Sequence, residues 1–148
     1  MRTIALTNQK GGVGKTTTAV NLGAGLARLG HRTLLIDLDP QANATLAFGL
    51  QPHTLENTSY DLLAGRTTVE RGARPIDAKL SILPANLNLA GAEMELSSAI
   101  GREHVLRDRM EGATDYDYIL LDLPPSLGFA RGLLVRDPDA HGVRVVER

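Results

Sequence analysis

The chain has 148 residues, a hydrophobic content of 43% and a formal net charge of −1 at pH 7. This length suffices for one domain with a sizeable core, and the charge provides no overall basic field to hold nucleic acid. The absence of cysteine excludes disulfides, a thiolate nucleophile and a cysteine-ligated cluster, and no apolar run reaches the length of a membrane span.

The first residues of the chain predict a strand, a glycine-rich turn and a helix. A β-branched run over residues 3–7 predicts the strand, and apolar residues at helical spacing over 16–29 predict the helix. The turn between them lets backbone N–H groups converge on phosphate oxygens, and the helix N-terminus adds positive potential. The pattern therefore predicts a nucleotide-binding loop formed by Gly11, Gly12, Val13, Gly14, Lys15, Thr16 and Thr17.

Two side chains of this loop suit the chemistry of a bound nucleotide, and a third is unusual. Lys15 can reach the β- and γ-phosphates, and the Thr16 hydroxyl can ligate Mg²⁺. The usual loop pattern has glycine where this chain has Gln9, and a second lysine, Lys10, follows it. The chain has only three lysines, so a lysine kept at this place indicates that a compact ammonium is needed. The alternative is a solvated lysine beside a glycine turn.

A second buried strand is predicted over residues 32–36, and it ends in two acidic residues. Ligands of open α/β sheets bind beyond the carboxyl ends of the strands, which places Asp37 and Asp39 beside the phosphates. If the strand continues, alternation makes both side chains point the same way. The alternative is a strand-end aspartate that caps the turn before Pro40, and the phosphate loop disfavours it for Asp39.

The middle of the chain predicts scaffold elements. We expect short helices at 60–63 and 69–71, a strand at 79–83, and helices at 87–100 and 103–110. A further apolar strand at 118–121 ends in Asp122, which would hold Mg²⁺ through a water molecule because Mg²⁺ sheds water reluctantly.

Three motifs together resemble one family. The run K-G-G-V-G-K-T-T at 10–17 resembles the deviant Walker A box of the ParA, MinD and nitrogenase iron protein ATPases. The run D-L-D-P-Q-A-N-A-T at 37–45 resembles the signature of the ParA/Soj partition ATPases, and 118–128 resembles their Walker B strand.

The resemblance implies roles for individual residues. Lys10 would reach across a nucleotide-sandwich dimer to the partner's ATP, and Lys15 would join it in stabilising the phosphates. Asp39 would orient the attacking water. The predicted metal-site residues are Thr16, Asp122 and, in a supporting role, Asp37.

The expected fold is a P-loop α/β domain with a mostly parallel sheet and helices on both faces. The resemblance implies that the Asp122 strand lies beside the phosphate-loop strand, in the partial order 3-2-4-1. We expect residues 1–128 to be the N-terminal part of a ParA-type domain. Residues 129–148 lack a helical period, and we expect a non-family, weakly ordered or only opportunistically paired tail, from a truncation or frameshift after Gly128. The C-terminal half of the family fold would be missing, and the edge at 3–8 would be bare.

The resemblance implies a cytoplasmic, nucleoid-associated ATPase for chromosome or plasmid partition, with ATP and Mg²⁺ as cofactors. Its ATP-dependent homodimer would bind DNA non-specifically, and a ParB-like partner would stimulate hydrolysis. One alternative is a truncated, non-catalytic remnant, and as a truncated form the chain would be a poor ATPase and a poor DNA binder. Another is a MinD-like division-site regulator, which needs a C-terminal amphipathic membrane helix that 132–148 lack. No membrane partner is expected.

Overall fold

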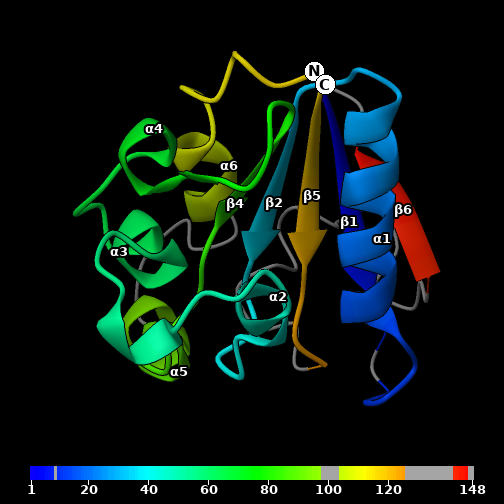
Figure 1. Cartoon of the computed structure of the whole chain (residues 1–148). Helices are drawn as coiled ribbons and strands as arrows, with labels where there is room; N and C mark the ends of the chain where they lie inside the picture. Colours follow the sequence, from blue (N-terminus) through cyan, green and yellow to red (C-terminus); the bar gives the residue numbers. More distant parts are fainter. Residues whose placement is uncertain (9, 98–103, 126–141, 147–148) are drawn as a thin grey trace.

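The computed structural model describes residues 1–8, 10–97, 104–125 and 142–146. These residues form a six-stranded sheet in the order β3-β4-β2-β5-β1-β6 (Figure 1). The four central strands β4, β2, β5 and β1 are parallel, and the edge strands β3 and β6 are antiparallel to their neighbours. The strands are β1 (Arg2–Thr7), β2 (Thr33–Asp37), β3 (Arg74–Pro75), β4 (Leu80–Leu83), β5 (Tyr118–Asp122) and β6 (Gly142–Val146).

Both faces of the parallel strands are buried, which explains why these strands are continuous apolar runs rather than alternating ones. In β2 every residue is buried, and the side chains divide between two hydrophobic clusters. Leu34 and Ile36 belong to one cluster, and Leu35 belongs to the other. The predicted α/β fold with a mostly parallel sheet is confirmed, and so is the predicted order of the four parallel strands.

Helices cover the two faces unequally (Figure 1). The long helix α1 packs through Ala19 into one cluster and contacts all four parallel strands. Shorter helices supply Leu62, Val69, Leu89 and Leu106 to the cluster on the other face. The helices are α1 (Lys15–Arg28), α2 (Asn43–Ala47), the 3-10 turn η1 (Pro52–Thr54), α3 (Ser59–Leu63), α4 (Val69–Gly72), α5 (Leu89–Ser97) and α6 (Val105–Arg109). No helix in the described ranges is long and apolar enough to cross a membrane.

The structure corrects one expectation about the sheet. The edge of β1 is not bare, because β6 pairs with it in antiparallel register from Thr3 opposite Val146 to Thr7 opposite Gly142. The unpaired N–H and C=O groups of an edge strand favour the addition of a further strand. The run Val143-Arg144-Val145-Val146 is rich in β-branched residues, which suit that position. The rest of the expected tail, and residues 98–103 of the expected helices, lie outside the described residues.

The sheet register places three strand ends at one edge. Leu6 of β1 stands opposite Asp122 of β5, and Asp122 stands opposite Asp37 of β2. The phosphate-loop segment follows β1, and the short helix α2 follows β2 at the same end of the sheet (Figure 1). The strand ends therefore bring the predicted site residues together.

Candidate functional site

The turn after β1 has the backbone geometry of an anion-binding loop. Gly12 and Gly14 have φ angles of 70° and 84°, a region that residues with a Cβ rarely adopt. Gly14 is also the N-cap of α1, and it supplies no side-chain cap. The first N–H groups of α1 thus lack the usual cap, and the helix N-terminus presents its positive end to the space in front of the loop.

The two lysines of the loop are placed differently. Lys15 is half-buried, and its Nζ donates a hydrogen bond to the carbonyl oxygen of Asn8 at 3.2 Å, which folds the ammonium back over the loop. Lys10 is exposed, and its backbone N–H donates to Oδ1 of Asn8 at 2.9 Å. Asn8 therefore fixes the entrance of the loop from both its backbone and its side chain. Lys15 lines the pocket described next, and Lys10 does not.

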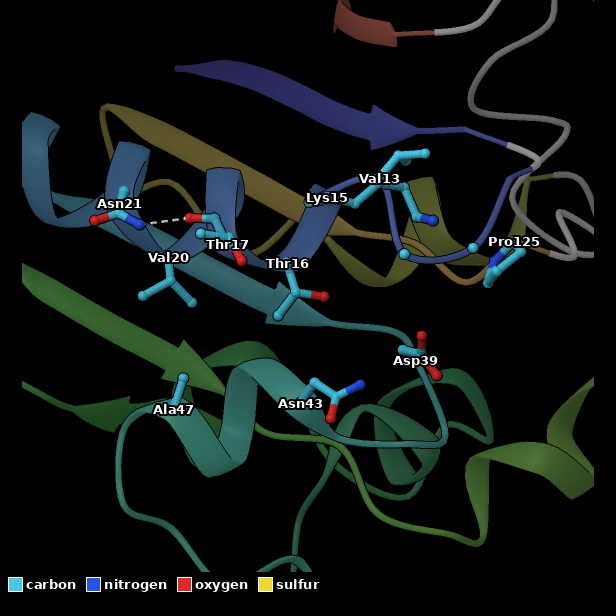
Figure 2. Close-up of a pocket in the computed structure, with 13 residues that line it drawn as sticks. Val13, Lys15, Thr16, Thr17, Val20, Asn21, Asp39, Asn43, Ala47 and Pro125 are labelled. Carbon is cyan, nitrogen blue, oxygen red and sulfur yellow. Dashed lines mark hydrogen bonds between the residues drawn. The ribbon is translucent and has the colours of Figure 1, made fainter.

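An open pocket of about 560 Å³ lies in front of the loop, within the size range of small-molecule sites. Figure 2 shows Thr16 on one side of the pocket and Asp39 and Asn43 across from it. The wall thus combines the start of α1 with the segment that follows β2. The lining residues are Gly11, Gly12, Val13, Gly14, Lys15, Thr16, Thr17, Val20, Asn21, Asp39, Asn43, Ala47 and Pro125.

Asp39 reaches the pocket from a tight turn. Its Oδ1 accepts a hydrogen bond from the N–H of Gln41 at 2.9 Å, and its carbonyl oxygen accepts one from the N–H of Ala42 at 2.8 Å. The side chain is half-buried and lines the pocket. A carboxylate held in this way can accept a hydrogen bond from a water molecule in front of the phosphates.

Asp122 is the most unusual group near the loop. It is 1% exposed, and neither carboxylate oxygen has a hydrogen-bond partner among the described residues. Burial raises the pKa of Asp122 to about 6, and the nearby Asp39 carboxylate contributes to this rise. The Thr16 hydroxyl and the Lys15 ammonium lower the pKa in part. A buried carboxylate without partners is costly unless something else neutralises it, so this group is poised for a cation or for water bound to one.

Asp37 is as deeply buried as Asp122 but is well satisfied. Its Oδ1 accepts from the N–H of Asp39 at 3.2 Å, and its Oδ2 accepts from the N–H and hydroxyl of Thr45 at 2.9 and 2.7 Å. Burial raises the pKa of Asp37 to about 7, although the Thr45 hydrogen bonds oppose the rise. Neither Asp37 nor Asp122 lines the pocket, but the oxygens of Asp37 already accept hydrogen bonds, which agrees better with its supporting role than with direct metal contact.

The oxygen donors near the loop suit Mg²⁺. The Thr16 hydroxyl and the Asp122 carboxylate are hard oxygen ligands, and Mg²⁺ is usually held by only one or two protein groups plus waters and phosphates. The described residues contain no cluster of three or more His, Cys, Asp or Glu that could hold a metal without such help. The carboxylate oxygens of Asp122, which have no hydrogen-bond partner among the described residues, leave room for such a ligand.

The structure brings together most of the predicted site residues but adds several that the sequence did not assign. The seven loop residues and Asp39 line one pocket, and Asp122, Asp37 and Lys10 are not among its lining residues. Val20, Asn21, Asn43, Ala47 and Pro125 also line the pocket and had no predicted role. Asn21 follows Thr17 by one helical turn and donates to its carbonyl oxygen at 2.7 Å, so its spacing on α1 was the available signal (Figure 2).

Comparisons with known proteins agree with this geometry. A family model described as an AAA domain matches residues 1–136. The sporulation initiation inhibitor protein Soj of Bacillus subtilis is 49% identical over an alignment of 135 residues, and the match covers 84% of this chain and 50% of that protein. The chromosome partitioning protein ParA of Myxococcus xanthus is 46% identical over 129 residues, covering 86% of this chain and 46% of that protein.

A solved structure is also similar to this chain. The cobyrinic acid a,c-diamide synthase of Mycobacterium smegmatis, with a bound ATP analogue and magnesium, matches with a TM-score of 0.85 and 40% identity. The match covers 90% of this chain and 56% of that one. The chain spans about half the length of the curated relatives it matches.

Proposed function

The chain belongs to the ParA/Soj family of P-loop ATPases with an AAA domain, and from this membership we propose that it binds and hydrolyses ATP as a switch for chromosome or plasmid partition. The names of the curated relatives support partition as the process. The bound ATP analogue and magnesium of the similar solved structure support ATP and Mg²⁺ as ligands. In this proposal, residues 1–128 are the ParA-type part of the chain.

One observation carries the proposal. The buried carboxylate of Asp122 stands at the end of β5, the strand next to β1, and lies close enough to Thr16 and Lys15 for both to lower its pKa. A phosphate-binding loop alone would fit many anions. The same loop beside an unsatisfied buried carboxylate fits an anion that arrives with a divalent cation, as a nucleoside triphosphate does.

In the proposed hydrolysis, each part of the reaction depends on particular residues of the chain. The loop N–H groups and the Lys15 ammonium bind the phosphate oxygens and stabilise the charge that develops on them. Asp39 accepts a hydrogen bond from the water that attacks the γ-phosphorus; the bond from that phosphorus to the bridging oxygen breaks, ADP leaves with that oxygen, and the proton of the water passes to the released phosphate. Thr16 and Asp122 would hold Mg²⁺, Asp122 through a water molecule, and Asp37 would have a supporting role. When bound, Mg²⁺ neutralises charge on the β- and γ-phosphates.

The proposal also includes an ATP-dependent switch between a single copy of the chain and a homodimer. Lys10 is exposed at the rim of the loop, a place from which it can reach the nucleotide of a second copy of the chain. ATP would close such a homodimer, the dimer would bind DNA without sequence preference, and a ParB-like protein would stimulate hydrolysis and release it. The protein would then act in the cytoplasm at the nucleoid. Similarity to proteins named Soj and ParA favours this function over a MinD-like division-site regulator.

The test is the magnesium dependence of nucleotide binding. Calorimetry should show ATP binding by the chain that strengthens when Mg²⁺ is added, and phosphate release should follow. Asp122→Asn should remove most of the gain from Mg²⁺, whereas Asp115→Asn, the same change at an exposed carboxylate, should not. If Mg²⁺ does not change the ATP affinity of the unmodified chain, the proposal is refuted.

A further inference from the structure

Thr45 is a buried polar residue that the proposed hydrolysis does not use. It lies in the short helix α2, and it is 0% exposed. A buried hydroxyl costs free energy unless it is hydrogen-bonded, so its partners show what it is for.

The Thr45 hydroxyl joins two separate parts of the chain. It donates a hydrogen bond to Oδ2 of Asp37 at 2.7 Å and accepts one from the N–H of Ala85 at 2.9 Å. Ala85 follows the end of β4, beyond Leu83, the last residue of β4 that pairs with β2. The hydroxyl therefore ties the segment after β2 to the segment after β4.

The same hydrogen bonds fix the segment that carries Asp39. Asp37 accepts from the N–H of Asp39 with one oxygen and from the N–H of Thr45 with the other, so one carboxylate holds both ends of residues 39–45. Ala42, within this segment, has a φ angle of 54°, which is unfavourable for a residue with a Cβ. Such a conformation persists only where the surroundings fix it.

We propose that Thr45 is a positioning residue, whose hydroxyl anchors the Asp39 segment to the end of β4 and so holds Asp39 at the wall of the nucleotide pocket. This inference rests on the proposed ATP hydrolysis for its consequence but not for its geometry. Without the hydroxyl, Asp37 loses one hydrogen bond and Ala85 loses its acceptor. Asp39 and Asn43 would then be free to leave the positions that Figure 2 shows across from Thr16.

The test compares Thr45→Val, which keeps the shape but removes the hydroxyl, with Thr45→Ser, which keeps the hydroxyl. In the ATP-free chain, Thr45→Val should make the amides of Asp39 and Ala85 exchange with solvent roughly five- to tenfold faster, as the loss of a hydrogen bond predicts. ATP turnover should fall roughly 10- to 100-fold with ATP affinity nearly unchanged, because misplaced catalytic groups act on the chemical step. Thr45→Ser should restore both measurements to near the unmodified values.

Thr67→Val is the matched control, because Thr67 is buried and its hydroxyl has no hydrogen-bond partner among the described residues. It should leave amide exchange and turnover unchanged. If Thr45→Val does not fold, Thr45→Ala against Thr45→Ser isolates the same hydroxyl. Equal exchange at Asp39 and Ala85 with and without the hydroxyl would overturn the inference. Absence of turnover in the unmodified chain would instead refute only the proposed hydrolysis, since the exchange measurement needs no nucleotide.

Discussion

Lys15 is the residue on which the proposed phosphate binding should depend most directly. Its ammonium already lies over the loop through its hydrogen bond to Asn8, so it needs little rearrangement to meet an anion. Lys15→Ala should weaken ATP binding by roughly 10- to 100-fold, the effect of losing a hydrogen bond to a charged group. Calorimetry measures this, with Lys79→Ala at an exposed lysine before β4 as the control. Unchanged affinity in Lys15→Ala would show that the loop is not the phosphate site.

Substitutions of Asp39 and Lys10 should affect ATP turnover more than ATP binding. Asp39 faces the pocket but is not part of the phosphate loop, so Asp39→Ala should keep ATP affinity within a few-fold and slow hydrolysis by about 100-fold or more. Lys10→Ala should spare binding by a single copy and reduce ATP-dependent dimerisation and turnover. Calorimetry, phosphate release and light scattering measure the three quantities. If Asp39→Ala hydrolyses ATP at the rate of the unmodified chain, Asp39 does not orient the attacking water.

At the residue scale, the motifs made the positions of the loop, Asp39 and Asp122 in the fold predictable, since each has a fixed spacing from a strand end, while their roles stay predictions. Thr45 and Asn43 belong to a quoted motif, yet their roles were not predictable. The reason is that Thr45 acts through Ala85, forty residues further on, and only the packing of α2 against the sheet brings them together.

Replacing glycine by alanine should change the stability of the fold in opposite directions at two helical positions. A Cβ on Gly72 of α4 would clash with Leu83 Cδ1 and would lie 2.7 Å from the carbonyl oxygen of Asn57. Gly72→Ala should therefore destabilise the fold by about 1–3 kcal/mol, the usual cost of overpacking. Gly25 of α1 is exposed with nothing within 4 Å, and Gly25→Ala should stabilise the fold by about 0.5–1 kcal/mol. Denaturant unfolding measures both, and a stabilising Gly72→Ala would contradict the close packing of α4 on β4.

The predicted elements include the long apolar ones and also the short helices α3 and α4. The strands at β1, β2, β4 and β5 and the helix α1 each lie within a residue or two of their expected bounds. The five-residue helix α2 and the two-residue strand β3 were not predicted, since neither segment shows an apolar period in the sequence. The antiparallel strand β6 was missed for another reason: it exists through pairing with β1, which no local pattern reveals.

For the whole molecule, β6 should protect the sheet. Removing residues 142–148 exposes the backbone groups along Thr3–Thr7 of β1, an apolar edge that favours association with other chains. We expect the melting temperature to fall by about 5–10 °C, which corresponds to a loss of a few kcal/mol. Thermal melts and light scattering measure the change, and removal of residues 147–148 alone is the control. A shortened chain that stays monomeric with an unchanged melting temperature would show that β6 contributes nothing to the fold.

The pairing of β1 with β5 also sets an order of events during synthesis. Arg2 pairs with Tyr118, so the strand that carries the phosphate loop leaves the ribosome first and meets its central neighbour only after nearly all the intervening chain has been made. At typical rates of about 5–20 residues per second, that interval lasts on the order of ten seconds. During this time an apolar strand has no partner in the sheet. Slower translation would therefore lengthen the time during which this apolar strand is exposed.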